Sequence, residues 1–173
     1  MSISIRRLAS EDDRSTFRSG NIELDRFFQR FAGQNQFRHH IGSTYVAVED
    51  GSILGFVTLT ASELMVADLP VSKRRRLPQY PLPVLRLARL AVDERAQGRG
   101  VGSALLRAVF MLAHRMASDF GCIGVVVDAK PEAVAFYEKL GFIALDARAG
   151  QLGDRPEPLP MFLELGAIPR PGA

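Results

Sequence analysis

The chain has 173 residues, 47% hydrophobic and 24% charged, so it is long enough for one folded domain and its composition excludes wholesale disorder. Its single cysteine excludes an internal disulfide, and its longest stretch without Asp, Glu, Lys or Arg, residues 51–62, is too short to span a membrane. The first ten residues carry Arg6 and Arg7 with no apolar block behind them, so no secretory signal is expected and we predict a cytoplasmic protein.

The net charge of +3 is unevenly distributed along the chain. Between Asp68 and Arg107 there are nine Lys and Arg against three Asp and Glu, which leaves the rest of the chain net negative. Such asymmetry is typical of a protein that meets a polyanionic ligand or partner. A solvated basic face explains the charge equally well at this point.

The first third of the chain predicts a short strand and two helices. Residues 4–8 are expected to form the strand, and the polar run 10–13 is typical of a helix start. Asn21 is the predicted N-cap of a second helix. The apolar residues that follow it recur at helical spacing, which favours packing in the core: Leu24, Phe27, Phe28 and Phe31.

The middle of the chain predicts a hairpin and an irregular connection. Strands are expected at 43–49 and 52–62, because Asp50-Gly51 between two β-rich runs is a strong hairpin signal. Residues 69–83 hold four prolines together with a run of four basic residues, so we expect an irregular crossing there.

The second half of the chain alternates strands and helices. A strand over 84–92 leads into a glycine-rich turn and a helix over 101–118 with one apolar face. A buried strand follows at 122–128, and a helix opens at Pro131 and stops at Gly141. Closing strands are expected at 142–145 and 160–164.

The glycine-rich turn has the chemistry of a phosphate cradle. Its residues are Gln97-Gly98-Arg99-Gly100-Val101-Gly102, followed by Ser103 in the predicted helix. Glycines let backbone N–H groups converge on a ligand, and a helix N-terminus favours negative charge. The turn lacks the Gly-Lys-Ser/Thr of a Walker loop and the spacing of a dinucleotide fingerprint. Taken alone, the turn is weak evidence for phosphate binding, and a plain tight turn explains it better.

Two motifs in the expected order make the chain resemble the GNAT superfamily of N-acetyltransferases. The first is the run from Leu90 to Ala96 followed by Gln97-x-x-Gly100-x-Gly102, which resembles the family's acetyl-CoA-binding motif. The second is the run from Ala133 to Phe142, which contains Phe136-Tyr137. The resemblance implies an α+β fold with a mixed, mostly antiparallel central sheet of six to seven strands flanked by about four helices. It also implies a single domain over 1–166 with a tail over 167–173.

Further segments resemble one subgroup, the toxin acetyltransferases of bacterial toxin–antitoxin pairs. They are Ser19-Gly20-Asn21, the run 55–59, Leu69-Pro70 before the basic run, and the run 87–92. This resemblance implies an enzyme that acetylates the free amine of aminoacyl-tRNA, and a ribbon-helix-helix antitoxin as its protein partner. Which aminoacyl group reacts and the oligomeric state, a homodimer included, are left open by the sequence.

The resemblance assigns roles to individual residues. Tyr137 is the expected general acid, because a phenol is protonated at neutral pH and can protonate a departing thiolate. A packed core tyrosine is the alternative. The cofactor is expected to lie against backbone groups of the strand end and turn, and near Phe136: Leu90, Ala91, Val92, Gln97, Gly98, Arg99, Gly100, Val101, Gly102 and Ser103. Many relatives carry Asn where this chain has Lys130, which could reach a phosphate or point to solvent.

Basic residues near the middle of the chain are the predicted contacts for tRNA phosphates. They are Lys73, Arg74, Arg75, Arg76, Arg86 and Arg89. No carboxylate stands out as a general base, and the histidines show no spacing typical of metal ligands, so we expect no metal.

Two other functions compete with this hypothesis. An acetyltransferase for a small-molecule amine or a protein N-terminus would have little use for the basic run at 73–76. A non-catalytic module that binds CoA or an antitoxin would not need Tyr137.

Overall fold

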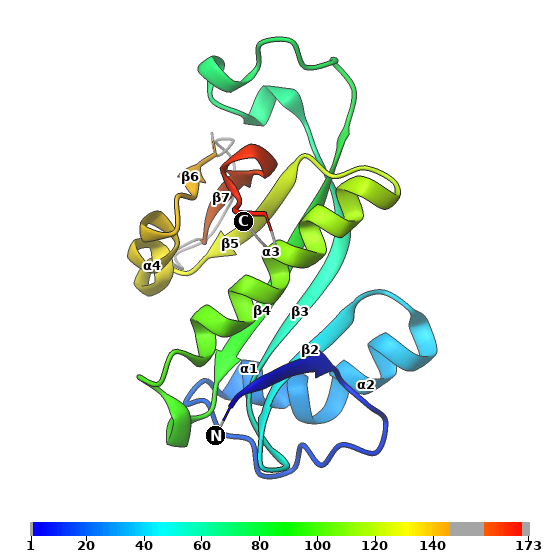
Figure 1. Ribbon diagram of the computed structural model, residues 1–173, viewed down its shortest axis with the longest axis vertical. Coiled ribbons are helices and arrows are strands. Elements are labelled where there is room, and N and C mark those ends of the chain that lie inside the picture. Colours follow the sequence, from blue (N-terminus) through cyan, green and yellow to red (C-terminus); the bar gives the residue numbers. More distant parts are fainter. Residues whose placement is uncertain (1, 146–157, 171–173) are drawn as a thin grey trace. The chain divides into compact units, whose positions relative to one another are not determined.

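The computed structural model describes residues 2–145 and 158–170. Their strands form a seven-stranded sheet in the order β1-β2-β3-β4-β5-β7-β6 (Figure 1). The strands are β1 (Ser4–Arg7), β2 (Ser43–Glu49), β3 (Ser52–Leu64), β4 (Leu82–Val92), β5 (Gly124–Ala129), β6 (Ile143–Ala144) and β7 (Leu159–Glu164). The α-helices are α1 (Ile22–Arg26), α2 (Ala32–Gln34), α3 (Val101–Asp119) and α4 (Val134–Lys139). The predicted α+β class is confirmed.

The chain packs as two compact units, residues 1–60 with 87–109 and residues 61–86 with 110–173. In the first unit, β1, β2 and β3 form an antiparallel meander. Asp50 and Gly51 both adopt positive φ at the β2–β3 turn, as the predicted hairpin requires. Phe28 stacks on Phe56 with ring centroids 4.4 Å apart, and Phe17 meets both rings edge-on.

One helical segment spans residues 22–39 and includes two π-helical turns, Phe27–Phe31 and Asn35–His39. The predicted cap is confirmed, since the Asn21 side chain accepts a hydrogen bond from the Leu24 N–H at 3.0 Å. Phe31 is 42% exposed, so its predicted place in the core is wrong. The wider π-helical turn changes the angle between successive residues and removes Phe31 from the apolar stripe.

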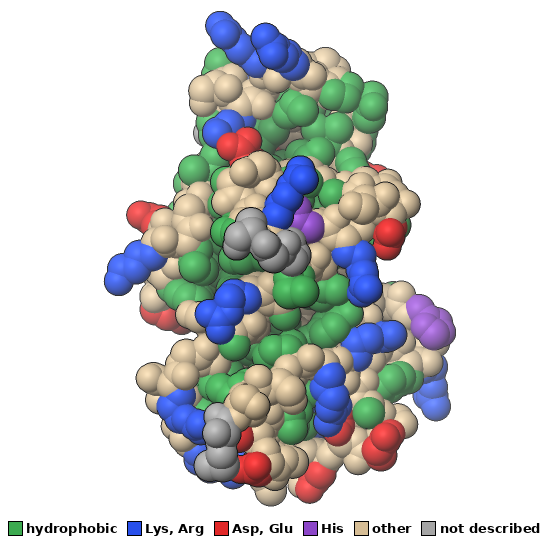
Figure 2. Space-filling model, in the orientation of Figure 1, with side chains coloured by type: hydrophobic (Ala, Val, Ile, Leu, Met, Phe, Trp, Pro, Cys, Tyr) green, Lys and Arg blue, Asp and Glu red, His purple; other side chains and the backbone are tan. Residues whose placement is uncertain are grey.

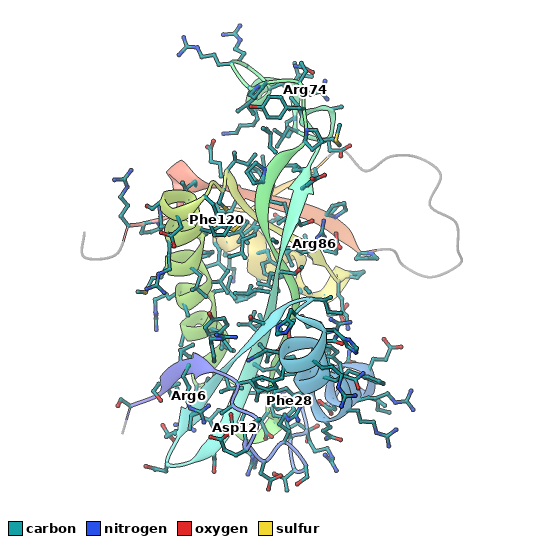
Figure 3. All side chains as sticks on the ribbon, turned by 90° about the vertical axis from the view of Figure 1, so that its right-hand side faces the viewer. Arg6, Asp12, Phe28, Arg74, Arg86 and Phe120 are labelled. Carbon is teal, nitrogen blue, oxygen red and sulfur yellow. The ribbon has the colours of Figure 1, made fainter. Side chains whose placement is uncertain are left out.

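No helix begins at residues 10–13. The Asp12 carboxylate accepts hydrogen bonds from the Ala9 N–H and from Arg6 (Figure 3), and Asp13 binds the N–H and hydroxyl of Ser15. These local bonds satisfy the backbone in turns, and so they compete with a helix.

In the second unit, β7 pairs antiparallel with both β5 and β6. A Cβ at Gly124 would collide with the Leu163 carbonyl and the Phe162 ring, so β5 needs glycine at this point. Just before β5, Cys122 is buried, and its burial raises the pKa of the thiol. The connection 65–81 contains two short 3₁₀ turns, Val66–Asp68 and Val71–Lys73, which confirms the predicted irregular crossing.

The predicted helix over 101–118 is confirmed as α3, and its apolar face is buried through Val101, Leu105, Val109, Ala113 and Met116. The proposed boundary between the domain and its tail stays a prediction. Ile168, on the predicted tail, is buried, and its carbonyl lies 3.0 Å from the His114 ring nitrogen Nε2. Residues 171–173 of the predicted tail lie outside the described residues. Among the helices that the structure describes, none is long and apolar enough to cross a membrane.

Candidate functional site

The glycine turn presents backbone N–H groups at the start of α3. Gly98 and Gly100 have φ of 80° and 81°, and a Cβ on either would meet nothing within 4 Å. The first bond inside the helix runs from the Ala104 N–H to the Gly100 carbonyl at 3.0 Å. The N–H groups of Val101, Gly102 and Ser103 therefore have no acceptor within the helix. Converging donors at a helix N-terminus make an anion site, and the open space over the glycines leaves room for one.

Asp93 holds the approach to this turn in place. Its carboxylate is almost fully buried and accepts hydrogen bonds from the backbone N–H groups of Arg18 (3.2 Å) and Arg95 (3.0 Å). The Arg95 guanidinium donates to it as well, with Nε at 2.9 Å. Burial acts to raise the pKa of Asp93, but the bonds from Arg95 and Arg18 outweigh it and hold the pKa below its usual value. Sequence reasoning missed this role, although an Asp directly after a strand and before a helical turn is a typical cap.

Two side chains of the turn face the protein instead of open space. The Gln97 amide donates to the carbonyls of Ser19 (3.1 Å) and Val92 (3.3 Å). The Arg99 guanidinium reaches both oxygens of Glu49 at 2.9 Å. The free charge expected at Arg99 is therefore paired, and Glu49 is occupied by an ion pair. The groups of the turn that remain available to a ligand are therefore its backbone N–H groups.

The strand end before the turn depends on a second residue that sequence reasoning missed. A Cβ at Gly55 would lie 2.9 Å from the Val101 side chain and 3.0 Å from the Ala91 carbonyl. Glycine there lets β3 pass close to the start of α3 and to the predicted strand residues Leu90, Ala91 and Val92. Ala91 is buried, and Leu90 and Val92 are half-buried. A glycine inside a strand is the usual signal of such a close approach.

Tyr137, in the second unit, lies on α4 with its ring packed and its hydroxyl uncommitted. The residue is only 4% exposed, and its ring meets Phe142 edge-on at 5.3 Å between centroids. Among the described residues the hydroxyl forms no hydrogen bond. Among the described residues no fully buried side-chain oxygen lacks a partner, so the Tyr137 hydroxyl is not completely buried. Burial raises the pKa of Tyr137 to about 12, which keeps the proton on the oxygen at neutral pH.

Two further predicted cofactor contacts lie in α4 or just before it. Phe136 is half-buried, with its ring centroid 5.3 Å from that of Tyr137. Lys130 is exposed just before Pro131, and its side chain caps nothing. The structure leaves its ammonium group free to meet a phosphate or solvent, and its predicted role stays a prediction.

Basic side chains gather on the β3–β4 connection, where Arg74 lies (Figures 2 and 3). The four residues of the basic run 73–76 differ in their contacts. Lys73 forms an ion pair with Glu164 at 2.9 Å. Arg74 donates to the carbonyls of Leu69 (2.7 Å) and Ala67 (2.9 Å), so it holds the loop together. Arg75 and Arg76 are exposed and form no ion pair within the described residues. Only these last two are therefore displayed as free cations in this run.

The two predicted tRNA residues on β4 also differ from each other. Arg86 binds Asp128 at 2.9 Å and lies 3.3 Å from the Ser62 hydroxyl. Arg89 lies over the Phe27 ring, with its Cζ 3.7 Å from the centroid. Burial lowers the pKa of Arg89. Among the described residues Arg89 has no carboxylate partner.

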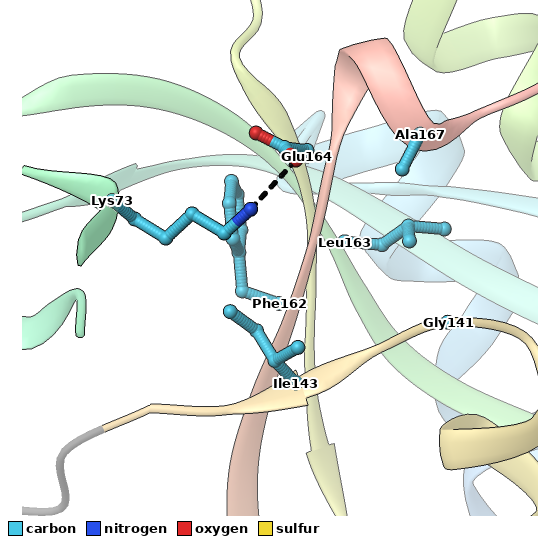
Figure 4. Close-up of a pocket in the computed structure, with 7 residues that line it drawn as sticks. All are labelled: Lys73, Gly141, Ile143, Phe162, Leu163, Glu164 and Ala167. Carbon is cyan, nitrogen blue, oxygen red and sulfur yellow. Dashed lines mark hydrogen bonds and ion pairs between the residues drawn. The ribbon is translucent and has the colours of Figure 1, made fainter.

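A small cavity in the second unit includes one of these predicted residues, Lys73, in its lining (Figure 4). It has a volume of about 40 Å³ and is lined by Lys73, Gly141, Ile143, Phe162, Leu163, Glu164 and Ala167. That volume is enough for one or two waters and far too small for a cofactor. The described residues also contain no group of three or more His, Cys, Asp or Glu that could hold a metal ion.

Comparison with known proteins supports the reading of these motifs. The model of the acetyltransferase (GNAT) domain family matches residues 40–144. The chain is similar to a tRNA-acetylating toxin of Mycobacterium tuberculosis, with 38% identity over 139 residues, 79% of this chain and 82% of that protein.

Two solved structures share the fold at similar identity. AtaT complexed with acetyl-methionyl-tRNAfMet is 26% identical with a TM-score of 0.83, over 96% of this chain and 97% of that one. AtaTR bound with AcCoA is 27% identical with a TM-score of 0.76, over 96% and 95%. With the family model covering more than half of its length, the chain belongs to the GNAT acetyltransferase family.

Proposed function

We propose that this protein is a toxin-type N-acetyltransferase that transfers the acetyl group of acetyl-CoA to the free α-amine of aminoacyl-tRNA and so blocks translation. The observation that carries the proposal is the 38% identity to a tRNA-acetylating toxin over most of both chains. The similarity to structures of AtaT with acetyl-methionyl-tRNA and of AtaTR with AcCoA supports both the acceptor and the donor.

The residues of the turn fit a pyrophosphate. The turn combines three N–H groups without helical acceptors, two open glycines of positive φ and an approach held by Asp93. We assign the pyrophosphate of acetyl-CoA to residues 97–103 and its thioester arm to the backbone of Leu90, Ala91 and Val92. When bound, acetyl-CoA supplies an activated thioester to the amine.

Tyr137 is assigned as the general acid. Its packed ring fixes the position of the hydroxyl, and its raised pKa keeps a proton available for the departing thiolate. A thiol has a pKa of about 8.5, below that of this phenol, so donation from Tyr137 to the leaving sulfur is uphill on its own. The proton that the amine loses on acetylation restores the Tyr137 hydroxyl, and the thiol leaves with the proton that Tyr137 gave.

A general base is not required for this acceptor. A free α-amine has a pKa of about 7.7–8.0, and an adjacent ester lowers it, so much of the amine is neutral at physiological pH. Glu49 is held by Arg99, and Glu63 is exposed on β3. A lysine ε-amine, with a pKa of about 10.4, would be a poor acceptor in such a site.

Charge and partners complete the proposal. Arg75 and Arg76, with Lys73, Arg74, Arg86 and Arg89 near them in sequence, would attract tRNA phosphates without reading sequence. A ribbon-helix-helix antitoxin is the expected protein partner. We place the protein in the cytoplasm, where charged tRNA is found, with its acetyltransferase domain over 1–166 and a tail over 167–173.

The direct test is to incubate the protein with charged total tRNA and labelled acetyl-CoA, and then to identify the acetylated amino acid. Label should appear on aminoacyl-tRNA and disappear when the tRNA is deacylated beforehand. Efficient labelling of small amines or of peptide N-termini, with none on charged tRNA, would contradict the proposal. Coupled translation should stop only when active enzyme and acetyl-CoA are both present.

A further inference from the structure

Arg89 is placed differently from the other arginines near the glycine turn. Arg95 and Arg99 each hold a carboxylate, at 2.9 Å in both cases. The guanidinium of Arg89 instead lies over Phe27, with Cζ 3.7 Å from the ring centroid. Within the described residues it forms no hydrogen bond or ion pair. It is a half-buried cation whose donors are unused by the protein.

The ring beneath Arg89 is itself fixed. Phe27 is 6% exposed and packs at 6.3 Å, between centroids, from Phe56 in the aromatic core of the first unit. A guanidinium held by stacking keeps its planar fork in one orientation, so little rotational entropy is lost when it binds an anion. Burial lowers the pKa of Arg89, and no carboxylate among the described residues offsets this cost. An anion that arrives with a ligand would offset it.

We propose that Arg89 binds the phosphate attached to the aminoacylated terminal nucleotide of the acceptor, and that acetylation is efficient only when this phosphate is present. The inference rests on the proposed function and names the chemical group that the acceptor must carry. A guanidinium fork matches two oxygens of a phosphate in a bidentate pair. Arg89 directly precedes Leu90, within about 7 Å along the strand of the segment assigned to the thioester arm.

The chemistry of the acceptor agrees with that placement. The amino acid is esterified to one side of the terminal ribose, and the phosphate is attached to the 5′ side of the same ribose. A residue that binds the phosphate therefore positions the amine as well. Free amino acids and peptide N-termini carry the same amine but lack the phosphate, so this contact would separate charged tRNA from the far more abundant free amines.

Two hydrolysis-resistant acceptors isolate the phosphate: 3′-aminoacylamino-3′-deoxyadenosine with and without a 5′-phosphate. For the wild type we expect a KM about 10- to 100-fold lower with the phosphate, the range for hydrogen bonds to a charged group, and similar kcat values. Arg89→Met keeps a long side chain over Phe27 but removes the charge. In this variant the KM of the phosphorylated acceptor should rise to the KM of the acceptor without phosphate. Arg89→Lys should recover part of the preference.

The control is Arg107→Met, which removes an exposed arginine of α3 in the same unit and should leave the KM ratio unchanged. Equal KM values for the two acceptors with the wild type would overturn the inference, whatever the variants do. If a folded Arg89→Met variant lost the same factor in kcat/KM on both acceptors, the inference would also be overturned, because Arg89 would then have only a packing role. If the wild type acetylates no charged tRNA, the proposed function fails first, and this result is distinct from a lost phosphate preference.

Discussion

The glycine turn and the helix that carries Tyr137 differ in which groups have no partner in the protein: backbone N–H groups in the turn and a side-chain hydroxyl on the helix. In the turn the polar side chains are committed, because Asp93 holds backbone N–H groups, Gln97 holds carbonyls and Arg99 holds Glu49. The free groups there are backbone donors. On α4 the side chains that pack are aromatic, and the free group is the hydroxyl of Tyr137.

This difference separates binding from chemistry. Backbone donors attract an anion whatever side chains surround them, so the turn is sensitive mainly to groups that block or repel at glycine positions. A single hydroxyl can be removed with almost no change in packing. Substitutions in the turn should therefore change the affinity for acetyl-CoA, and substitution of Tyr137 should change turnover.

The largest effect is expected for Tyr137→Phe. The variant keeps the ring contacts with Phe142 and Phe136 but loses the proton donor, so kcat should fall by about 100-fold or more with the Kd for acetyl-CoA within twofold of wild type. Stopped-flow turnover and calorimetry measure the two separately. Since the pKa of Tyr137 is about 12, the wild-type rate should show no fall up to pH 10. Unchanged turnover would mean that water protonates the thiolate.

Gly102→Asp should have the largest effect on binding. It places a carboxylate in the first turn of α3, where it repels a pyrophosphate, and we expect the Kd for acetyl-CoA to rise about tenfold or more. An acidic residue at a helix N-terminus does not destabilise the helix, so thermal unfolding should be unaffected. Gly102→Ser is the neutral control for size. A folded Gly102→Asp with wild-type affinity would show that the turn does not hold the pyrophosphate.

A smaller, salt-dependent effect is expected from the free cations of the basic run. Arg75→Gln combined with Arg76→Asn should raise the KM for charged tRNA several-fold. The slope of log KM against log salt concentration should also fall by up to about two units. Asn suits position 76, where φ is 66°. The rate with a small amine acceptor should not change.

Arg74→Ala is the contrast, because Arg74 holds the loop through carbonyls and should alter stability more than the salt slope. An identical salt slope for wild type and the double variant would leave Arg75 and Arg76 as solvated surface charge.

The smallest effect on turnover is expected for Asp93→Asn, because this substitution should change mainly the free energy of unfolding. Losing the charge weakens four hydrogen bonds to a buried group, and we expect the free energy of unfolding to fall by about 1–3 kcal/mol at pH 7. Because folding lowers the pKa of Asp93, this contribution is fully present above the unfolded pKa of about 3.9 and is lost as the pH falls through the folded pKa.

Denaturant unfolding of wild type and variant should therefore converge in strong acid. Asp119→Asn, at the exposed end of α3, is the matched control and should change little. A constant difference between wild type and Asp93→Asn at every pH would exclude the carboxylate as its source.

Hydrophobic periodicity and turn chemistry predicted most of the fold. The 43–49 strand, the Asp50-Gly51 hairpin, the Asn21 cap and the α3 face were all correct, because each depends on neighbours in sequence. The predicted helix at 10–13 failed because Asp12 found partners in Ala9 and Arg6. Phe31 failed because π-helical turns have no distinct signal in a single sequence.

For the site, the motifs identified which segments matter but not how their charges are paired. Glu49 lies 50 positions from Arg99, and Asp128 lies 42 positions from Arg86, so no local pattern could reveal those pairs. The same holds for the contact of Arg89 with Phe27. Local sequence patterns therefore located the glycine turn and Tyr137 but could not separate the free arginines from the committed ones.

The burial of Cys122 has a practical consequence for measuring the reaction. It is the one cysteine of the chain, its sulfur lies 3.2 Å from the Gly124 carbonyl, and burial holds its thiol in the protonated, unreactive form. Each acetyl transfer releases one exposed CoA thiol. A chromogenic disulfide reagent added during turnover should therefore report the CoA thiol in real time, with no background from the folded enzyme. A slow additional rise in absorbance would measure the fraction of enzyme that unfolds and exposes Cys122.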